Sequence, residues 1–300
     1  MLDGIARQTF SVIPRPTLQV VIADNECSHA ARETCVAFEQ RSGVPVTYVP
    51  EPRRGISFAR NVCLDNIPEG SDFFAWIDDD EVPEPDWLER LLEVQTATGA
   101  DVVQGAVVPE FPDGTPGWLA RGNFFGRPRR GWAGTPLHRE EHQELDYAGT
   151  NNALVRVCVV NDLSLRFDPA LALTGGEDSQ FFRTLVAEGY RIVYAPRARV
   201  RETVPAERAT VWYRLKLEFR IGYTRAAQGN RRKKRKPIRW LRARWYDSGP
   251  EKISSGLGLL IRNGLTGRLD KDGALVGGMR IAYGLGQFAH AVGIDYTPYR

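Results

Sequence analysis

The chain has 300 residues, 42% hydrophobic and 26% charged with a net charge of +3, which is ordinary for a globular protein of one large or two modest domains. Its four cysteines are scattered without a CxxC pair, which argues against a disulfide framework and against a zinc site. No apolar run approaches the ~18 residues that span a bilayer, and no signal-peptide pattern follows Met1. We therefore expect a cytoplasmic protein.

Strand and helix patterns alternate through the first third of the chain. Apolar runs predict strands at residues 18–23, 46–49, 73–77 and 101–108, and helical patterns separate them at residues 28–41, 56–66 and 86–98. Ser28 is the expected N-cap of the first of these helices. This alternation predicts an α/β fold with a mostly parallel central sheet that is covered by helices on both faces.

The pattern changes after residue 108. Residues 109–147 are rich in Gly and Pro and are predicted to be irregular, which is typical of functional loops. A strand at residues 153–160, a helix at 179–188 and a strand at 191–195 follow. The rest is helical, basic and then Gly-rich. We expect a catalytic domain at residues 1–205 and a helical, basic C-terminal extension at residues 206–300.

Positive charge is concentrated in the extension. Residues 231–244 contain nine basic residues, with Trp240 inside the run and Trp245 just after it. Three interpretations stay open: a nucleic-acid contact, attachment to an anionic membrane surface, and a solvated loop. The following residues 253–293 are apolar but too broken by glycine to span a membrane, which suits helices at a membrane interface.

Three consecutive aspartates, Asp78, Asp79 and Asp80, directly follow the predicted strand at residues 73–77. Carboxylates this close repel one another unless a cation offsets their charge. Oxygen ligands at a strand end suit Mg²⁺ or Mn²⁺ held together with a substrate phosphate, and ligands of open α/β sheets bind at this edge. The alternative is a solvated acidic turn that caps the helix starting near Asp86.

Four blocks of sequence resemble the family 2 glycosyltransferases of the GT-A fold, in particular the bacterial exopolysaccharide branch of the succinoglycan type. They are a strand ending in an aspartate (residues 21–25), a Gly-x-x-x-Ala-Arg-Asn helix start (55–61), the aspartates with the following residues (77–83), and a Glu-Asp motif (175–178). They occur in the family's order and cover roughly residues 18–220. The resemblance implies a metal-dependent, inverting transfer of a sugar from a nucleotide-sugar donor.

The resemblance also implies roles for the residues of the donor site. Asp80 would bind the metal, Asp78 would contact the donor ribose or sugar, and Asp79 would point away from one of these partners. Asp24 would accept a hydrogen bond from the base or ribose, and Arg60 would pair with the base or the diphosphate. Their alternatives are an ordinary strand-end turn for Asp24 and a surface helix position for Arg60.

Asp178 of the Glu-Asp motif is the candidate general base toward the acceptor hydroxyl. Glu177 beside it is a candidate donor-binding residue, and Thr174, Gly175 and Gly176 would let the backbone approach the donor sugar closely. The alternative for the two acids is N-terminal helix capping. Asn151, with its neighbour Asn152, would line the sugar pocket or form a simple turn.

Two departures from the family pattern stand out. The family sheet begins with a strand that has no counterpart here, so we expect a chain that is N-terminally short, with residues 1–16 as a helix tail and loop. A histidine frequent in the wider family is absent near residues 199–205, where Glu202 supplies a metal carboxylate or is a surface residue. His138 and His142 have i, i+4 spacing but lie in a predicted loop and are weak metal candidates.

The sequence therefore predicts a glycosyltransferase of polysaccharide synthesis, and we expect its saccharide acceptor to be lipid-linked. An anionic membrane surface is a further expected partner, at the inner face of the cell membrane, and nucleic acid is disfavoured. Two alternatives remain: a nucleotidyl- or phosphoryl-transferring enzyme with two metals, and a catalytically impaired relative that binds nucleic acid or membrane.

Overall fold

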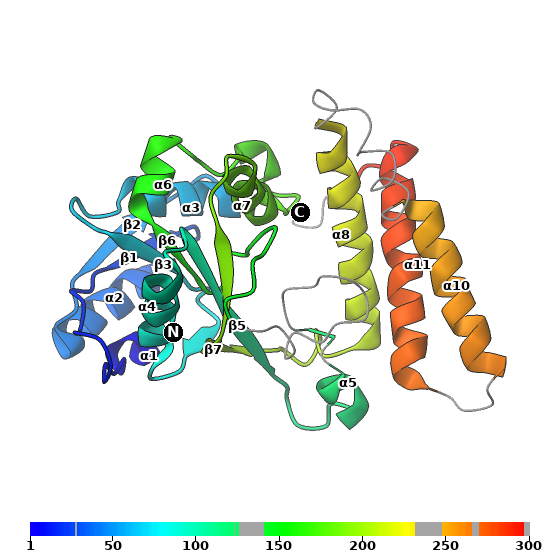
Figure 1. Cartoon of the computed structure of the whole chain (residues 1–300), viewed down its shortest axis with the longest axis horizontal. Coiled ribbons are helices and arrows are strands. Elements are labelled where there is room, and N and C mark those ends of the chain that lie inside the picture. The colour runs from blue at the N-terminus through cyan, green and yellow to red at the C-terminus, as the bar shows by residue number, and fades with distance from the viewer. Residues whose placement is uncertain (28, 123, 126–140, 232–247, 266–269, 297–300) are drawn as a thin grey trace. The chain divides into compact units, whose positions relative to one another are not determined.

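The computed structural model describes residues 1–27, 29–122, 124–125, 141–231, 248–265 and 270–296. The chain forms two compact units, one of residues 1–110 and 126–203, the other of residues 111–125 and 204–300 (Figure 1). The basic run from residue 232 onward, Ser28 as a helix cap, and His138 lie outside the described residues.

The first unit opens with a small parallel β-α-β arrangement. It consists of α1 (Leu2–Ala6), β1 (Val20–Asp24), α2 (His29–Ser42), β2 (Val46–Pro50) and α3 (Ile56–Asp65). β1 and β2 pair in parallel, with Val20 opposite Val46 and Asp24 opposite Pro50. The predicted strands and helices of this stretch are confirmed to within two residues at each end that the structure describes. Both strands end at the same edge, so Asp24 lies at their carboxyl ends.

The described residues also form a five-stranded sheet in the order β3-β6-β5-β7-β4. These strands are β3 (Phe73–Trp76), β4 (Glu81–Pro83), β5 (Val102–Glu110), β6 (Ala153–Arg156) and β7 (Ile192–Thr203). β5 and β7 run parallel, and the other three pairings are antiparallel. The α/β class is confirmed, but this sheet is mixed and not mostly parallel, because β6 returns between β3 and β5 and the short β4 turns back along β7.

The run at residues 153–160 corrects a second prediction. Only β6 is extended, and the chain then turns into α6 (Val157–Asp162), where Val159 and Val160 are buried. A short apolar run has no period that separates a buried strand from a buried helix. β4 has only three residues, too short to give a sequence signal.

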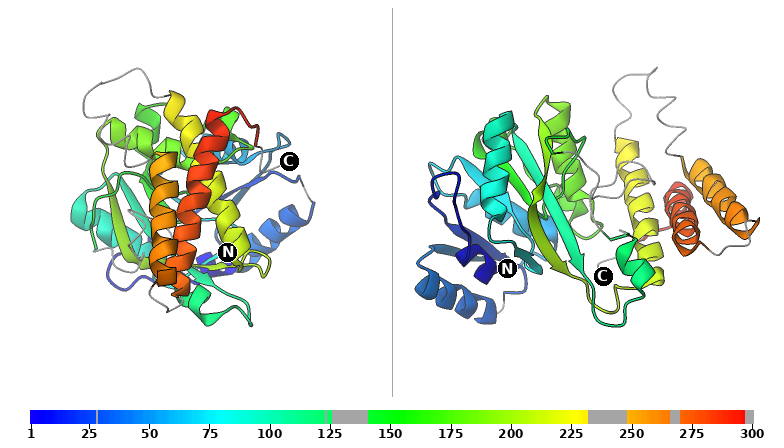
Figure 2. Two further views of the ribbon diagram at one scale, coloured as in Figure 1. Left: turned by 90° about the vertical axis from the view of Figure 1, so that its right-hand side faces the viewer. Right: turned by 60° about the horizontal axis from the view of Figure 1, so that its bottom comes forward.

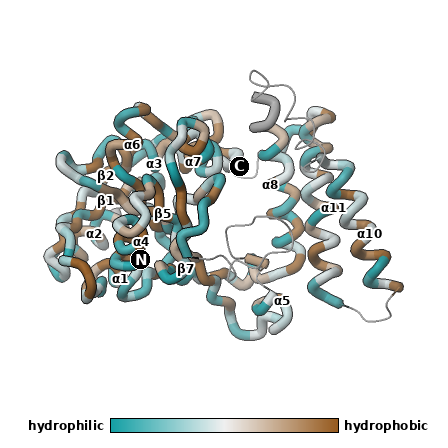
Figure 3. Tube along the Cα trace, viewed as in Figure 1, coloured by the Kyte–Doolittle hydropathy of each residue, from teal (hydrophilic) through white to brown (hydrophobic). Residues whose placement is uncertain are grey.

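The two faces of the five-stranded sheet carry separate cores, because neighbouring strand residues point to opposite faces. On β5, Val102 packs in the core with Phe182 of α7 (Glu177–Ala187), whereas Val103 packs with Leu91 of α4 (Trp87–Thr98). Phe182 and Leu91 are fully buried, and each contributes about 1.5–3 kcal/mol to stability. Hydrophobic residues accordingly lie in the middle of the unit, around β5 (Figure 3).

The second unit contains α5 (Gly117–Arg121) and the long helices α8 (Val211–Arg231), α10 (Gly249–Leu265) and α11 (Lys271–Ala291). α11 lies between α8 and α10, and the views of Figures 1 and 2 show the three side by side. Glycines allow this close packing: a Cβ on Gly222 of α8 would lie 2.0 Å from the carbonyl oxygen of Tyr283. In the part of the chain that the structure describes, no helix is long and apolar enough to cross a bilayer.

Candidate functional site

The three aspartates form the turn that connects β3 to β4. Asp78 follows the strand and is half-buried, whereas Asp79 and Asp80 are exposed. The backbone N–H of Asp78 donates to Oε2 of Glu81 at 2.9 Å, which closes the turn. The turn therefore exposes Asp79 and Asp80 to solvent, and the carboxyl group of Glu81 holds it in place.

Glu81 is fully buried in β4, and its register partner on β7 is Glu202. Burial, with added repulsion from Asp78, Glu202 and Asp80, raises the pKa of Glu81 to about 8. Its Oε1 is buried and has no hydrogen-bond partner among the described residues. The acidic side chains at this edge of the sheet therefore disfavour the charged form of Glu81, and a cation would offset that repulsion.

The donor set suits a hard cation, because every candidate ligand at this edge is a carboxylate oxygen. Within the described ranges, no three His, Cys, Asp or Glu side chains are grouped closely enough to hold a metal ion by themselves. These residues thus fit an ion that is bound by one or two carboxylates and completed by the phosphates of a substrate, as Mg²⁺ commonly is.

Arg60 of α3 connects the aspartate turn to the Glu-Asp motif. Its guanidinium lies 3.9 Å from Oδ1 of Asp78 and forms an ion pair with Oε1 of Glu177. The Arg60 side chain is only 10% exposed and also lies over the ring of Phe167, 5.6 Å from its centroid. Arg60 is therefore not a surface residue, and in this structure its charge is directed at two carboxylates of the protein.

The Glu-Asp motif begins α7. Gly175 and Gly176 precede it with φ of 79° and 87°, a backbone conformation that favours glycine, and Gly176 is the N-cap. Glu177 is buried, and burial together with Asp178 raises its pKa, against the opposing effect of Arg60. Asp178 is half-buried, and its Oδ1 accepts the N–H of Ser179 at 2.6 Å.

Asp24 ends β1 and is 8% exposed. Its Oδ1 accepts the backbone N–H groups of Glu26 and Cys27 at 2.9 and 3.0 Å, and its Oδ2 accepts the hydroxyl of Tyr48 at 2.7 Å. This hydrogen bond contributes most to raising the pKa of Tyr48 to about 12. Asp24 thus organises the strand end, and a ligand would meet a carboxylate that is already fixed in orientation.

Asn151 and Asn152 precede β6 and differ sharply in environment. Asn151 is partly exposed, whereas Asn152 is fully buried with φ of 91°. The Asn152 amide donates to the carbonyl oxygens of Ala106 and Ala198, both at 2.9 Å, and accepts from Trp87 Nε1 at 2.7 Å. The Asn152 side chain thus joins β5 and β7 to α4, and of the two asparagines only Asn151 stays a candidate for the sugar pocket.

The structure brings part of the predicted site together. Arg60 contacts both Asp78 and Glu177, and the charges of Asp80 and Glu202 act on the buried carboxyl group of Glu81. Sequence reasoning assigned no role to Glu81. The sequence signal for a role of Glu81 is its position directly after the three aspartates, because β4 is too short to be recognised as a strand.

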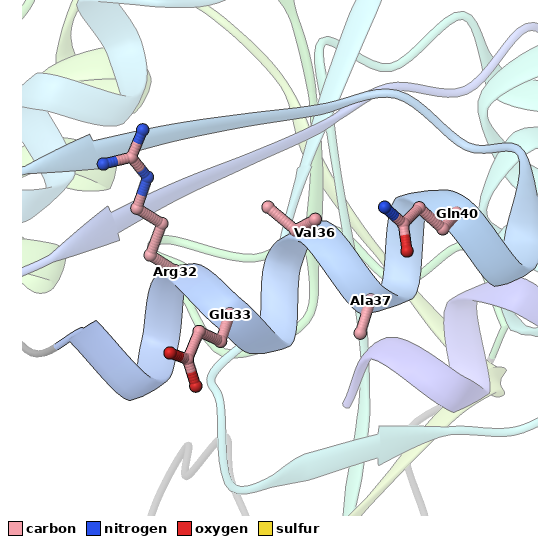
Figure 4. A pocket seen from close by; sticks show the side chains of 5 residues that line it. All are labelled: Arg32, Glu33, Val36, Ala37 and Gln40. Atoms are coloured by element: carbon pink, nitrogen blue, oxygen red, sulfur yellow. The ribbon is translucent and has the colours of Figure 1, made fainter.

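A surface hollow elsewhere in this unit has a different character. It runs along α2 and is lined by Arg32, Glu33, Val36, Ala37 and Gln40 (Figure 4). All five side chains come from one helix face, and none of them belongs to the predicted site. The hollow offers no convergent set of groups for a nucleotide.

Comparison with known proteins agrees with this architecture. Residues 1–163 match the model of glycosyl transferase family 2. The chain is 36% identical over 215 residues to the succinoglycan biosynthesis protein ExoM of Rhizobium meliloti, a match covering 72% of this chain and 66% of that protein. It is 32% identical over 101 residues to ExoW of the same organism, a match covering 33% of this chain and 32% of ExoW.

Solved structures of S. aureus TarS show the same fold. One superposes with a TM-score of 0.51 at 14% identity and covers 92% of this chain and 51% of that chain. TarS 1-349 in complex with UDP gives a TM-score of 0.50 at 14% identity, with 100% of this chain and 90% of that chain covered.

The α/β fold with its central sheet is similar to that of GT-A glycosyltransferases such as TarS. The chain belongs to glycosyl transferase family 2, which confirms the predicted resemblance to its exopolysaccharide branch. The matches span no more than 66% of the length of either succinoglycan protein.

Proposed function

We propose that this chain is a metal-dependent, inverting glycosyltransferase that moves a sugar from a nucleotide-sugar donor to a saccharide acceptor in exopolysaccharide synthesis. One observation carries the proposal: Arg60 contacts Asp78 at the end of β3 and Glu177 at the start of α7. The candidate donor-binding turn and the candidate base, Asp178, are thereby held around one side chain. A lipid-linked saccharide is the proposed acceptor, by analogy with succinoglycan assembly.

The proposed reaction is a single displacement. The acceptor hydroxyl attacks the anomeric carbon while the bond to the diphosphate breaks on the opposite face, so the configuration inverts. Asp178 takes the hydroxyl proton late in this step. A bound Mg²⁺ or Mn²⁺, held by Asp80 and Glu202, would act as a Lewis acid on the leaving diphosphate.

The remaining candidate residues of the site bind and position the donor. Asp78 and Asp79 contact the donor ribose and sugar, and Asp24 accepts from the base or ribose. Gly175 and Gly176 let the backbone approach the sugar without a Cβ, and Asn151 lies at the edge of the pocket. In this proposal Arg60 keeps Glu177 and Asp78 in place, and its charge favours the ionised form of Glu177.

The donor site is tested by thermal stabilisation of the protein with a panel of nucleoside diphosphates, with and without Mn²⁺. We expect a Mn²⁺-dependent rise in Tm for one nucleotide, lost in Asp80→Asn. Stabilisation by no nucleotide would contradict the proposal.

The catalytic step is tested with Asp178→Asn in single-turnover reactions. Removal of a general base lowers the rate by about 10²–10⁴-fold, while nucleotide binding stays. Glu188→Gln, an exposed acid at the far end of α7, is the matched control and leaves the rate unchanged. Release of pyrophosphate or phosphate in place of a nucleoside diphosphate would favour the nucleotidyl- or phosphoryl-transfer alternative.

A further inference from the structure

Asn61 of α3 holds the backbone of Phe167, a residue that lies 106 positions further along the chain. Its Nδ2 donates to the carbonyl oxygen of Phe167 at 2.9 Å, and its Oδ1 accepts the N–H of the same residue at 2.8 Å. Residues 165–168 belong to no helix or strand, so these two bonds take the place of those that a neighbouring strand would supply. The position of the Phe167 ring is therefore set from α3.

The Phe167 ring is 1% exposed and contacts three parts of the candidate site. It packs edge-on against Trp76, the last residue of β3, with the ring centroids 5.7 Å apart. It stacks on Phe181 of α7, with the centroids 4.3 Å apart and the planes inclined by 9°. The Arg60 guanidinium lies over the same ring. One ring thus touches the strand before the aspartate turn, the helix that begins with the Glu-Asp motif, and the arginine that contacts both.

Two of these contacts lie close in the chain to candidate site residues. Trp76 precedes Asp78 by two residues, and Phe181 follows Asp178 by three, which is about one helical turn. Phe181 is itself only 2% exposed, and a closely packed interior transmits a displacement instead of absorbing it. A shift of the Phe167 ring therefore changes the separation between Asp78 and Asp178.

We propose that Asn61 is a positioning residue for sugar transfer, which acts through the Phe167 ring and sets the distance between the aspartate turn and the candidate base. This inference rests on the proposed function. Transfer requires the base to lie within hydrogen-bond reach of the acceptor hydroxyl, whereas nucleotide binding needs only the ends of β1 and β3. Loss of the Asn61 contact therefore slows the chemical step and leaves nucleotide affinity unchanged.

Two variants and a matched control test this role. Asn61→Asp keeps the acceptor for the Phe167 N–H but places an oxygen against the carbonyl group, and Phe167→Leu keeps the backbone but removes the ring. Asn66→Asp, at the C-cap of the same helix, loses an equivalent amide contact, which Asn66 makes to the carbonyl oxygen of Val62 at 2.8 Å. Circular dichroism and Tm check the fold of each variant.

The probes are UDP-, GDP- and dTDP-linked glucose, galactose and N-acetylglucosamine with Mn²⁺, and water serves as the acceptor. In single turnovers, Asn61→Asp and Phe167→Leu slow hydrolysis by about ten- to a hundredfold, while the Kd of the matching nucleoside diphosphate stays the same. The double variant is no slower than Phe167→Leu alone, because both changes act on one ring. Amide hydrogen exchange of residues 174–179, which needs no substrate, becomes faster in both variants and stays native in Asn66→Asp.

Equal losses of rate in Asn61→Asp and Asn66→Asp would give Asn61 a merely structural role and overturn the inference. Native exchange at residues 174–179 in both variants overturns it too, as does a loss of nucleotide affinity that matches the loss of rate. A wild type that binds no nucleoside diphosphate overturns the proposed function and this role with it. A wild type that binds and hydrolyses, with variants that hydrolyse equally fast, overturns the inference alone.

Discussion

Arg60 on α3 forms a buried ion pair with Glu177 on α7, a residue that lies 117 positions further along the chain. The pair joins the small β1-β2 part of the first unit to the helix that carries the candidate base. Because both side chains are at most 10% exposed, neither charge is well solvated without the other. The ion pair therefore contributes both to the stability of the fold and to the geometry of the candidate site.

Truncating one member of this pair is the first prediction. Arg60→Ala leaves the Glu177 carboxylate buried without its partner, and the free energy of unfolding falls by about 3–5 kcal/mol. Urea denaturation measures this loss. Arg166→Ala removes a comparable contact to Asp65 between two exposed side chains and costs less than about 1 kcal/mol.

The double variant Arg60→Met with Glu177→Met separates pairing from packing. Removing both charges recovers much of the loss, since neither is left uncompensated. If the single and double variants lose equal stability, the ion pair is not what holds these elements together.

The sequence predicts the small β-α-β part well because its strands and helices have clear apolar periods and end in Gly, Pro or Asp. It also places Asp78 and Glu177 in motifs at strand and helix ends. It does not show that Arg60 faces both of them, because a helical position gives no information on a partner more than one hundred residues away. It fails at β6 and α6, where Val157, Val159 and Val160 suit a buried strand or a buried helix equally well.

Asn152 shows why local signals misplace a polar residue. A Gly-Thr-Asn-Asn run is typical of a turn, and nothing in it indicates that one amide enters the core. The left-handed φ of 91° turns the Asn152 side chain inward, where it meets carbonyl oxygens of two other strands.

The second prediction follows from this role. Asn152→Gly keeps the backbone conformation but leaves Trp87 Nε1 and the carbonyl oxygens of Ala106 and Ala198 without the amide. Three lost hydrogen bonds at about 1 kcal/mol each lower stability by roughly 3 kcal/mol. Ser164→Gly, at another left-handed position, is the control and stays near the native Tm in calorimetry. A change in Tm of equal size in both would contradict the prediction.

The third prediction concerns Glu89, whose carboxylate anchors the segment before β1. It accepts the N–H groups of Ser11, Val12 and Ile13 at 2.5–3.2 Å. Led by the bond from Val12, these hydrogen bonds lower the pKa of Glu89 to about 2 from its ordinary value of 4.5. The stabilisation is therefore complete above pH 4.5 and is lost as the pH falls from 4.5 through 2.

Glu89→Gln removes this pH dependence of the free energy of unfolding below pH 4.5, and it weakens the attachment of residues 11–13. The free energy of unfolding, followed from pH 6 to pH 2, should fall less steeply in the variant, and limited proteolysis should cleave near Val12 sooner. Glu33→Gln, an exposed acid on α2, keeps the native slope and cleavage rate. An unchanged slope in Glu89→Gln would show that other acids govern the acid transition.

The fourth prediction compares two glycines of the helical unit. A Cβ on Gly286 of α11 would lie 2.0 Å from the carbonyl oxygen of Phe219 on α8, whereas one on Gly258 of α10 meets nothing within 4 Å. Gly286→Ala forces α8 and α11 apart and destabilises by about 1–3 kcal/mol. Gly258→Ala instead stabilises by about 0.5–1 kcal/mol, because an exposed helical glycine gives way to a better helix former. Hydrogen exchange of α8 and α11 measures both effects, and faster exchange in Gly258→Ala than in Gly286→Ala would show that the two helices do not depend on this close approach.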